Sequence, residues 1–362
     1  INIKDEKGTT ILMNLAYNNN YDLAKAIVDT KADINVKNKE GFTALTFAAY
    51  RGSYNVAKLL VDSGADINVK DANGNTPLMY ASFNNYTNVL KLLIDSGANI
   101  NEKKSDGFTA LMFASYKGSY ATAEMLIQNG ADIKIKDVNG NDSFMYVAFN
   151  NRLNMLPLFT NSINIDATNN MGRTPLILAS INGHRDMVQN LIKLNANINA
   201  KDKDGNTALM YASFNNKSAL VNILIDANAE LNAQNNIGVT ALIFAAMNGY
   251  DRIVRTLIEE KADINIKDYY GNTALMYAAG KGNDRIINML KRNGPNVDDQ
   301  NRVGYTALFF AAVNGYEQSV QTLIDLKADV GIKDSYGKTA LMYAQERGYD
   351  NIVELLTKAS ES

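Results

Sequence analysis

Short apolar stretches alternate with polar, glycine-containing segments along the whole chain. In residues 207–213 (TALMYAS) the Leu and Tyr side chains fall on one side of a helix, and the small Ala residues allow neighbouring helices to approach closely. A second kind of stretch carries its own apolar stripe, for example at Val56, Leu59 and Leu60. The pattern therefore predicts pairs of short helices joined by polar turns.

The helix pairs recur at a fixed period. Turn glycines stand 33 residues apart, with one interval of 32 between Gly140 and Gly172. They are Gly8, Gly41, Gly74, Gly107, Gly140, Gly172, Gly205, Gly238, Gly271, Gly304 and Gly337. Around each lies the pattern D/N-x-x-G-x-T-A/P-L, followed by the two apolar stretches, as in residues 268–300. Self-similarity of this kind is typical of a repeat protein.

Turn and capping residues support the predicted helices. Gly supplies the turn conformation in a short hairpin, and Thr43 stands where a helix N-cap is required. Pro77 and Pro175 follow such a threonine as first helical residues, where the missing N–H costs nothing. Gly64 and Gly97 are expected to end the second helix in the left-handed conformation. Because one pair cannot bury its apolar face alone, the copies must stack.

These motifs resemble the ankyrin-repeat family over the whole chain, in eleven tandem copies. The resemblance implies an all-α repeat solenoid of helix-turn-helix pairs with short β-hairpin fingers, curved into a stack with a concave groove. We expect a single domain over residues 1–362. The expected repeats are 5–37, 38–70, 71–103, 104–136, 137–168, 169–201, 202–234, 235–267, 268–300, 301–333 and 334–362.

The chain departs from the family at the position after T-A/P-L, where the family usually has a His that bridges neighbouring repeats. Here the position holds Met79, Met112, Met145, Met210, Met276 and Met342, or Thr46, Ile177, Ile243 and Phe309. Met fills volume but cannot make the hydrogen bonds of an imidazole. We therefore expect the repeats to be held together by apolar packing.

The copy at 137–168 departs furthest from the others. It has Ser143 and Phe144 in place of Ala-Leu, Pro157 within the second helix, and one residue deleted near Ser162. Asp142 still offers a capping oxygen, so the first helix should form. A proline inside a helix removes a backbone hydrogen bond and costs about 3 kcal/mol. The copy is either a tolerated weak repeat or a hinge between two stacks.

A longer period of about two repeats also runs through the chain. Finger residues alternate between Asp71, Asp137, Asp202, Asp268 and Asp334 and the asparagines Asn38, Asn169, Asn235 and Asn301. This doublet looks like the unit of duplication. It either records copying history alone or has a meaning in the folded protein.

Composition removes several kinds of chemistry. The chain has no cysteine, and its one histidine, His184, is expected to make a local structural contact. Thiolate metal sites, disulfides and cysteine nucleophiles are therefore excluded, and no catalytic set or phosphate-binding loop stands out. We expect no enzyme activity, no cofactor and no bound metal.

No apolar run approaches the roughly 18 residues of a spanning helix, so neither membrane insertion nor a targeting segment is expected. The first residues match the tail of a repeat, which indicates that the chain begins inside a longer natural product.

A row of lysines occupies equivalent finger positions: Lys37, Lys70, Lys103, Lys136, Lys201, Lys267 and Lys333. Regularly spaced cations could follow an anionic polymer. Most of these lysines precede an aspartate, however, and the net charge of the chain is −2. We therefore expect local neutralisation by that aspartate and no binding of nucleic acid.

An aromatic residue ends the first helix in most copies. The position holds Tyr17, Tyr50, Phe83, Tyr116, Phe149 and Phe214, with Phe42 and Phe108 just past two finger glycines. The position then fades to Met247, Gly280, Val313 and Glu346, while Tyr270, Val303 and Tyr336 lie on later fingers. Rungs about 10 Å apart cannot stack, so these rings should stay partly open. They either form a contact surface or fold down over the core. By contrast, Phe47, Tyr80, Phe113, Tyr146 and Tyr211 within the helices are expected in the core.

These observations predict a non-catalytic scaffold that binds another protein or a peptide in the concave groove, with the aromatic rungs as the contact surface. The alternative is a structural, self-assembling segment that stacks through uncapped ends, or the repeat portion of a larger multidomain protein. We expect a soluble monomer, with end-to-end assembly as the alternative. The compartment and the partner are not indicated.

Overall fold

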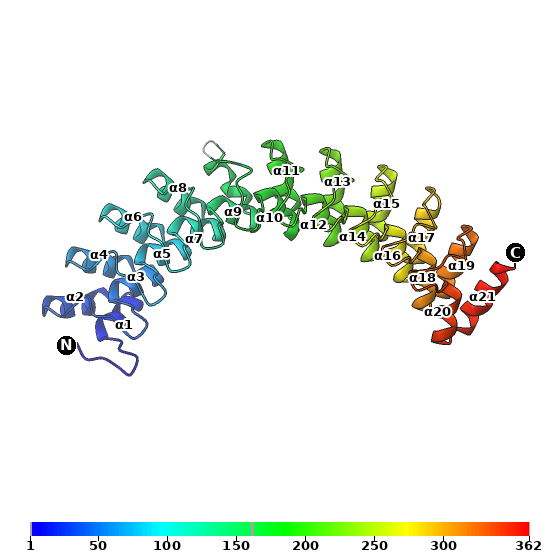
Figure 1. Cartoon of the computed structure of the whole chain (residues 1–362). Helices are drawn as coiled ribbons and strands as arrows, with labels where there is room; N and C mark the ends of the chain where they lie inside the picture. The colour runs from blue at the N-terminus through cyan, green and yellow to red at the C-terminus, as the bar shows by residue number, and fades with distance from the viewer. Residues whose placement is uncertain (1, 161–162, 362) are drawn as a thin grey trace. The chain divides into compact units, whose positions relative to one another are not determined.

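The computed structural model describes residues 2–160 and 163–361. The chain divides into two compact units, Ile1–Pro175 and Leu176–Ser362. Each unit is a row of short helix pairs (Figure 1). In the described residues the only β-pairing is an isolated bridge between Lys4 and Thr10. The predicted all-α solenoid of helix pairs is confirmed within each unit, while the repeat boundaries and the single domain over 1–362 stay predictions.

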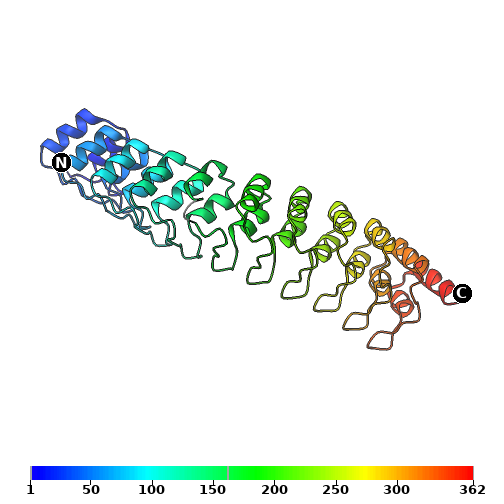
Figure 2. The ribbon, with the colours of Figure 1, turned by 90° about the horizontal axis from the view of Figure 1, so that it is seen from above.

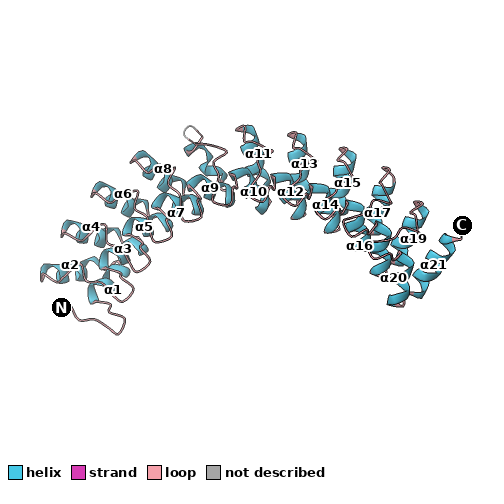
Figure 3. Ribbon diagram, in the orientation of Figure 1, coloured by secondary structure: helices cyan, strands magenta, loops and turns pink. Residues whose placement is uncertain are grey.

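In the first unit the first helices of the pairs pack against one another in one layer, and the second helices form the other layer (Figure 3). The first helices are α1 (Ile11–Tyr17), α3 (Ala44–Arg51), α5 (Pro77–Phe83), α7 (Ala110–Lys117) and α9 (Ser143–Phe149). The second helices are α2 (Tyr21–Asp29), α4 (Tyr54–Asp62), α6 (Thr87–Asp95), α8 (Tyr120–Gln128) and the 3-10 helix η1 (Leu153–Leu158).

The second unit has the same two layers. Its first helices are α10 (Pro175–Asn182), α12 (Ala208–Phe214), α14 (Ala241–Met247), α16 (Ala274–Gly280), α18 (Ala307–Val313) and α20 (Ala340–Arg347). Its second helices are α11 (Arg185–Lys193), α13 (Ser218–Asp226), α15 (Asp251–Glu259), α17 (Asp284–Lys291), α19 (Glu317–Asp325) and α21 (Asp350–Ser360). In both units we call the side formed by the first helices and the fingers the inner face.

The helix ends follow the predicted chemistry. Thr76 Oγ1 accepts a hydrogen bond from Met79 N at 3.4 Å, and the other first helices begin in a similar way, although the Thr306 side chain makes no such bond. Gly64 follows the second helix with φ 87°, as expected of a left-handed cap. Other copies tolerate the same conformation at Lys261 (φ 65°), so glycine is preferred there and not required.

Each finger is a tight turn that is too short to count as strands. In the finger of 71–103, Asp71 N donates to Asn75 O at 3.0 Å, and Asp71 Oδ1 accepts from the N–H groups of both Asn73 and Asn75 at 2.8 Å. Neighbouring fingers are linked by one backbone bond, such as Ala72 N to Glu40 O at 2.9 Å. Figure 2 shows the fingers of the second unit as parallel loops along one side of the helices.

Polar ladders join the copies, so the expectation of cohesion by apolar packing was incomplete. Side-chain oxygens of asparagines accept the backbone N–H of the residue 31 positions further on at 2.8–2.9 Å. These asparagines are Asn35, Asn68, Asn101, Asn199, Asn232 and Asn265. The bonds join neighbouring copies at the loop after the second helix, where each amide oxygen satisfies a backbone N–H group.

The lysine row forms a second ladder. The expected local neutralisation comes in part from other acids than the next aspartate, since Lys70 pairs with Glu102 at 2.6 Å and Lys267 with Asp299 at 2.8 Å. Lysine ammonium groups donate to the carbonyl oxygen at the same position of the following copy at 2.6–3.5 Å. The donors are Lys37, Lys70, Lys103, Lys136, Lys201 and Lys267. The aspartates that follow are turned into their own fingers, as Asp71 is, because the turn N–H groups compete for the carboxylate.

The copy at 137–168 keeps its first arm and changes its second. Asp142 Oδ1 accepts from Met145 N at 2.9 Å, so the predicted cap holds and α9 forms. The second arm is the 3-10 helix η1, which contains Pro157, and Phe159 behind it is fully buried. The expected site of the deletion near Ser162 lies outside the described residues. The hinge stays a prediction.

Candidate binding surface

The aromatic residues that end the first helices lie on the inner face and are partly open, as predicted. Five of these side chains are 39–46 % exposed: Tyr17, Tyr50, Tyr116, Phe149 and Phe214. Phe83, at the same position of α5, is half-buried. These rings therefore do not roof the core completely. We call Tyr17, Tyr50, Phe83, Tyr116 and Phe149 of the first unit the aromatic ladder.

The rings inside the helices do not lie in the core, so that expectation is wrong. Phe47, Tyr80, Phe113, Tyr146 and Tyr211 are all half-buried. The first four stand between rungs of the aromatic ladder and contact the rung of the preceding copy edge-on. Centroid distances are 6.0 Å for Tyr17–Phe47, 5.7 Å for Tyr50–Tyr80, 5.6 Å for Phe83–Phe113 and 6.3 Å for Tyr116–Tyr146.

Two finger rings join this arrangement. Phe42 lies 5.2 Å from Phe47 and 5.5 Å from Tyr80, and Phe108 lies 5.1 Å from Phe113 and 4.8 Å from Tyr146. The rings thus form two continuous clusters, each with members from three successive copies. One comprises Tyr17, Phe42, Phe47, Tyr50 and Tyr80, and the other Phe83, Phe108, Phe113, Tyr116 and Tyr146.

Cations cover two rungs of the aromatic ladder. The Arg51 guanidinium lies 4.6 Å from the centre of the Tyr17 ring, and the Lys117 ammonium lies 4.1 Å from that of Phe83. Both follow a rung directly in sequence and reach back to the rung of the preceding copy. In the first unit the residue after a rung is Asn or a cation and never an acid. This edge of the inner face therefore combines aromatic surface with positive charge.

The alternation of Asp and Asn fingers has a structural meaning. Tyr80 Oη donates to Asp71 Oδ2 at 2.5 Å, and Tyr277 Oη donates to Asp268 Oδ2 at 2.6 Å. Burial, together with the Asp268 carboxylate, raises the pKa of Tyr277 to about 12. The Asp fingers at 71, 137, 202, 268 and 334 all carry such a tyrosine.

Asn fingers carry Phe or Leu at the tyrosine position, so no phenol needs an acceptor. In three of the four Asn fingers the amide instead donates to the preceding copy, as Asn235 Nδ2 does to Asn206 Oδ1 at 2.9 Å. Asn169 and Asn301 make the same bond to Asn141 and Asn272. The doublet is therefore a hydrogen-bonding unit.

The second unit exposes its aromatic residues elsewhere. Only Phe214 continues the rung position with an aromatic ring, 5.4 Å from Phe244. The most exposed rings instead lie at fingertips, with Tyr269 at 55 %, Tyr270 at 57 % and Tyr336 at 75 %. The Arg302 guanidinium lies 3.8 Å from the Tyr269 ring centre. The rung position thus carries no aromatic residue after Phe214.

Within the described parts of the chain, no group of three or more His, Asp or Glu side chains is arranged to hold a metal ion. His184 lies half-buried at the N-terminus of α11. None of the helices formed by residues 2–160 and 163–361 is long and apolar enough to cross a membrane.

Comparison with models of protein families gives a match along the chain. The family described as ankyrin repeats (3 copies) matches residues 1–71, 64–137, 144–235, 215–301 and 280–362. No curated protein matches the chain. The matched ranges cover nearly all of the helix pairs described above. The chain therefore belongs to the ankyrin-repeat family.

Proposed function

We propose that the chain is a scaffold that binds a protein or peptide segment on the inner face of its first unit, with the aromatic ladder as the main contact. Ankyrin repeats generally serve protein interaction, and their proteins are typically not enzymes. The observation that carries the proposal is the row of partly open rungs, Tyr17 to Phe149, on rigid helix ends. Rigid aromatic anchors lose little conformational entropy on binding and commonly dominate interface energies.

The positive charge along this edge indicates which kind of partner segment the inner face would bind. Arg51 and Lys117 lie over ladder rings, and no acid follows a rung in the first unit. A partner segment with apolar and acidic side chains fits both features, because its carboxylates meet cations that are already desolvated on one side. Binding of such a segment should weaken as salt is raised.

The test uses a library of random displayed peptides, selected on the intact chain. The ladder variant changes Tyr50, Phe83, Tyr116 and Phe149 to Ser. We expect selected peptides to lose more than about tenfold in affinity, since aromatic anchors each carry about 2 kcal/mol or more. Folding stability should fall by about 1 kcal/mol for each lost ring contact, and the helical signal should persist.

A matched control changes exposed tyrosines of the second helices. Tyr21, Tyr54 and Tyr120 are 37–40 % exposed, like the rungs, but lie at the starts of α2, α4 and α8. Changing these three to Ser should leave peptide affinity unchanged. If both variants bind equally well, or if the ladder variant unfolds, the rungs are structural and the proposal fails.

A further inference from the structure

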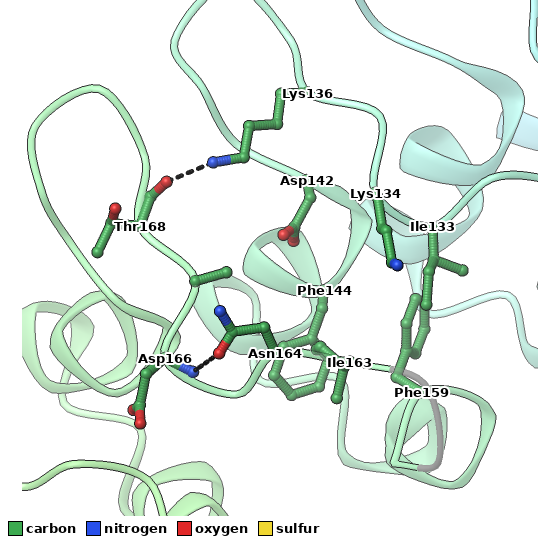
Figure 4. A pocket seen from close by; sticks show the side chains of 11 residues that line it. Ile133, Lys134, Lys136, Asp142, Phe144, Phe159, Ile163, Asn164, Asp166 and Thr168 are labelled. Atoms are coloured by element: carbon green, nitrogen blue, oxygen red, sulfur yellow. Dashed lines mark hydrogen bonds between the residues drawn. The ribbon is translucent and has the colours of Figure 1, made fainter.

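The largest departure from the repeat pattern coincides with a cavity. In the copy at 137–168 a cavity of about 390 Å³ opens between residues 133–136 and the segment 163–168 (Figure 4). Phe144 and Phe159 line its apolar side; their ring centres are 5.6 Å apart, and both side chains are almost fully buried beneath the cavity surface. At the other copies Phe144 is replaced by leucine, so the paired rings are particular to this site.

Two changes in sequence explain why this copy stays open. The second arm is η1 with Pro157 inside it, so the α-helix that closes other copies does not form. In addition, Lys134 stands where Asn35, Asn68 and Asn101 bridge to the next copy. An ammonium group has no acceptor, so it cannot bind the backbone N–H of residue 164 as an asparagine would.

A third change places a charge in the cavity. Other copies cap the first helix with Thr, and this one uses Asp142, which is 7 % exposed and points into the cavity in Figure 4. Its Oδ1 accepts from Met145 N at 2.9 Å. Burial raises the pKa of its carboxyl group, and the Lys136 charge at the rim offsets this only in part. A buried carboxylate that lacks a paired cation is costly, and a bound cation would relieve that cost.

We propose that this cavity binds a small ligand that carries a primary ammonium group on an apolar, ring-sized body. The ammonium group would pair with Asp142, and the apolar body would pack against Phe144, Phe159 and Ile163. This site is separate from the aromatic ladder and does not depend on the function proposed for it.

The cations at the rim do not make an anion site. Lys136 Nζ already donates to Thr168 O at 2.6 Å, and Lys134 is exposed, so its ammonium group is hydrated. A ligand anion would therefore find no buried partner, whereas a ligand cation finds one. The cavity thus favours a cationic ligand over an anionic one because its buried charged group is the Asp142 carboxylate, although lysines stand at the rim.

The probe is phenethylamine, titrated into the intact chain with isoleucine methyl labels. Ile133 and Ile163 line the cavity, and Ile94 in α6 serves as a distant reference. We expect saturable shifts at Ile133 and Ile163 only, with a dissociation constant on the order of 1 mM for a ligand of this size. Phenethyl alcohol and hydrocinnamate, which carry a neutral and an anionic group on the same ring, should each bind at least about tenfold more weakly.

The decisive variant is Asp142→Thr, which restores the residue of the other copies. The fold should persist, because Thr109 Oγ1 caps Met112 N at 3.3 Å in the preceding copy. Phenethylamine affinity should fall at least about tenfold with loss of the charged hydrogen bond. Asp142→Asn, which also keeps a capping oxygen, should behave in the same way.

A matched control, Thr109→Asp, places the same carboxylate at a copy without the cavity and should create no new amine site. Absence of methyl shifts up to about 10 mM amine would overturn the proposal, since a weaker site would fall below the efficiency of ordinary small ligands. Equal binding by Asp142→Thr and the unmodified chain would overturn it as well, and so would preferred binding of hydrocinnamate.

Discussion

The copies at 137–168 and 202–234 share their fingers and first helices but differ in their second arms. Both fingers pair an aspartate with a tyrosine, Asp137 with Tyr146 and Asp202 with Tyr211. The second arm is the 3-10 helix η1 in one copy and the α-helix α13 in the other. Finger and first helix are held by local side-chain bonds that Pro157 does not touch. The second helix depends on an unbroken run of backbone bonds, so one proline changes it.

The largest effect should come from the regular copy. Leu209 of α12 is 1 % exposed, and replacing it with Ala should cost about 2–5 kcal/mol through lost burial and a residual cavity. Chemical unfolding followed by the helical signal measures the loss. Lys203→Ala on the same copy's finger is the control and should change stability by no more than about 0.5 kcal/mol. Equal losses at both positions would contradict the assignment of core and finger.

The sequence predicted the helix pairs, their threonine caps and the open rungs, because each depends on residues within one copy. Thr76 and Met79 are three positions apart, and that spacing fixes the capping bond whatever lies around it. The sequence alone does not place Tyr80 on the inner face, because a helix of seven residues leaves its rotation about the helix axis undecided. The bond from Tyr80 to Asp71, nine residues away, holds the ring on the inner face.

The asparagine and lysine ladders and the cavity could not be predicted from residues within one copy. Asn35 acts on the backbone of Asp66, 31 residues further on, and that contact exists only once the copies have stacked. At the cavity three departures from the repeat pattern, Lys134, Asp142 and Pro157, come together in one copy and its neighbour. A repeated position, such as the rungs, can be recognised by comparing copies. A site built from exceptions needs the three-dimensional arrangement.

The next largest loss of stability is expected from breaking the tyrosine–aspartate hydrogen bond that the two fingers share. Tyr211→Phe removes the phenol that donates to the buried Asp202 carboxylate, and should cost about 1–3 kcal/mol. Asp202→Asn weakens the same bond. The double variant recreates the Asn and Phe combination of the neighbouring copy, Asn235 with Phe244. Its cost should therefore fall short of the sum of the single costs by about 1 kcal/mol, measured by a double-mutant cycle. Strict additivity would show that the alternation is history alone.

A smaller difference is expected in the rates of hydrogen exchange of η1 and α13. Amide hydrogens of Leu153–Leu158 should exchange at least about tenfold faster than those of Ser218–Asp226, because η1 lacks the regular helical bonds. Hydrogen exchange with mass spectrometry resolves both segments in one experiment. Equal protection would remove the case for a hinge in the copy at 137–168.

The smallest effect should come from restoring one rung of the asparagine ladder. Lys134→Asn supplies an amide oxygen to the backbone N–H of Asn164, as Asn101 does for Asp132 at 2.8 Å. One net hydrogen bond is worth about 0.5–1.5 kcal/mol, less the cost of ordering the side chain. We expect a gain near the lower end, seen as slower exchange in Leu153–Leu158 and a slightly higher unfolding midpoint. Lys134→Ala removes the same charge and supplies no acceptor. If it stabilises the copy equally, the gain comes from removing the lysine, and the missing bridge does not explain why this copy differs from 202–234.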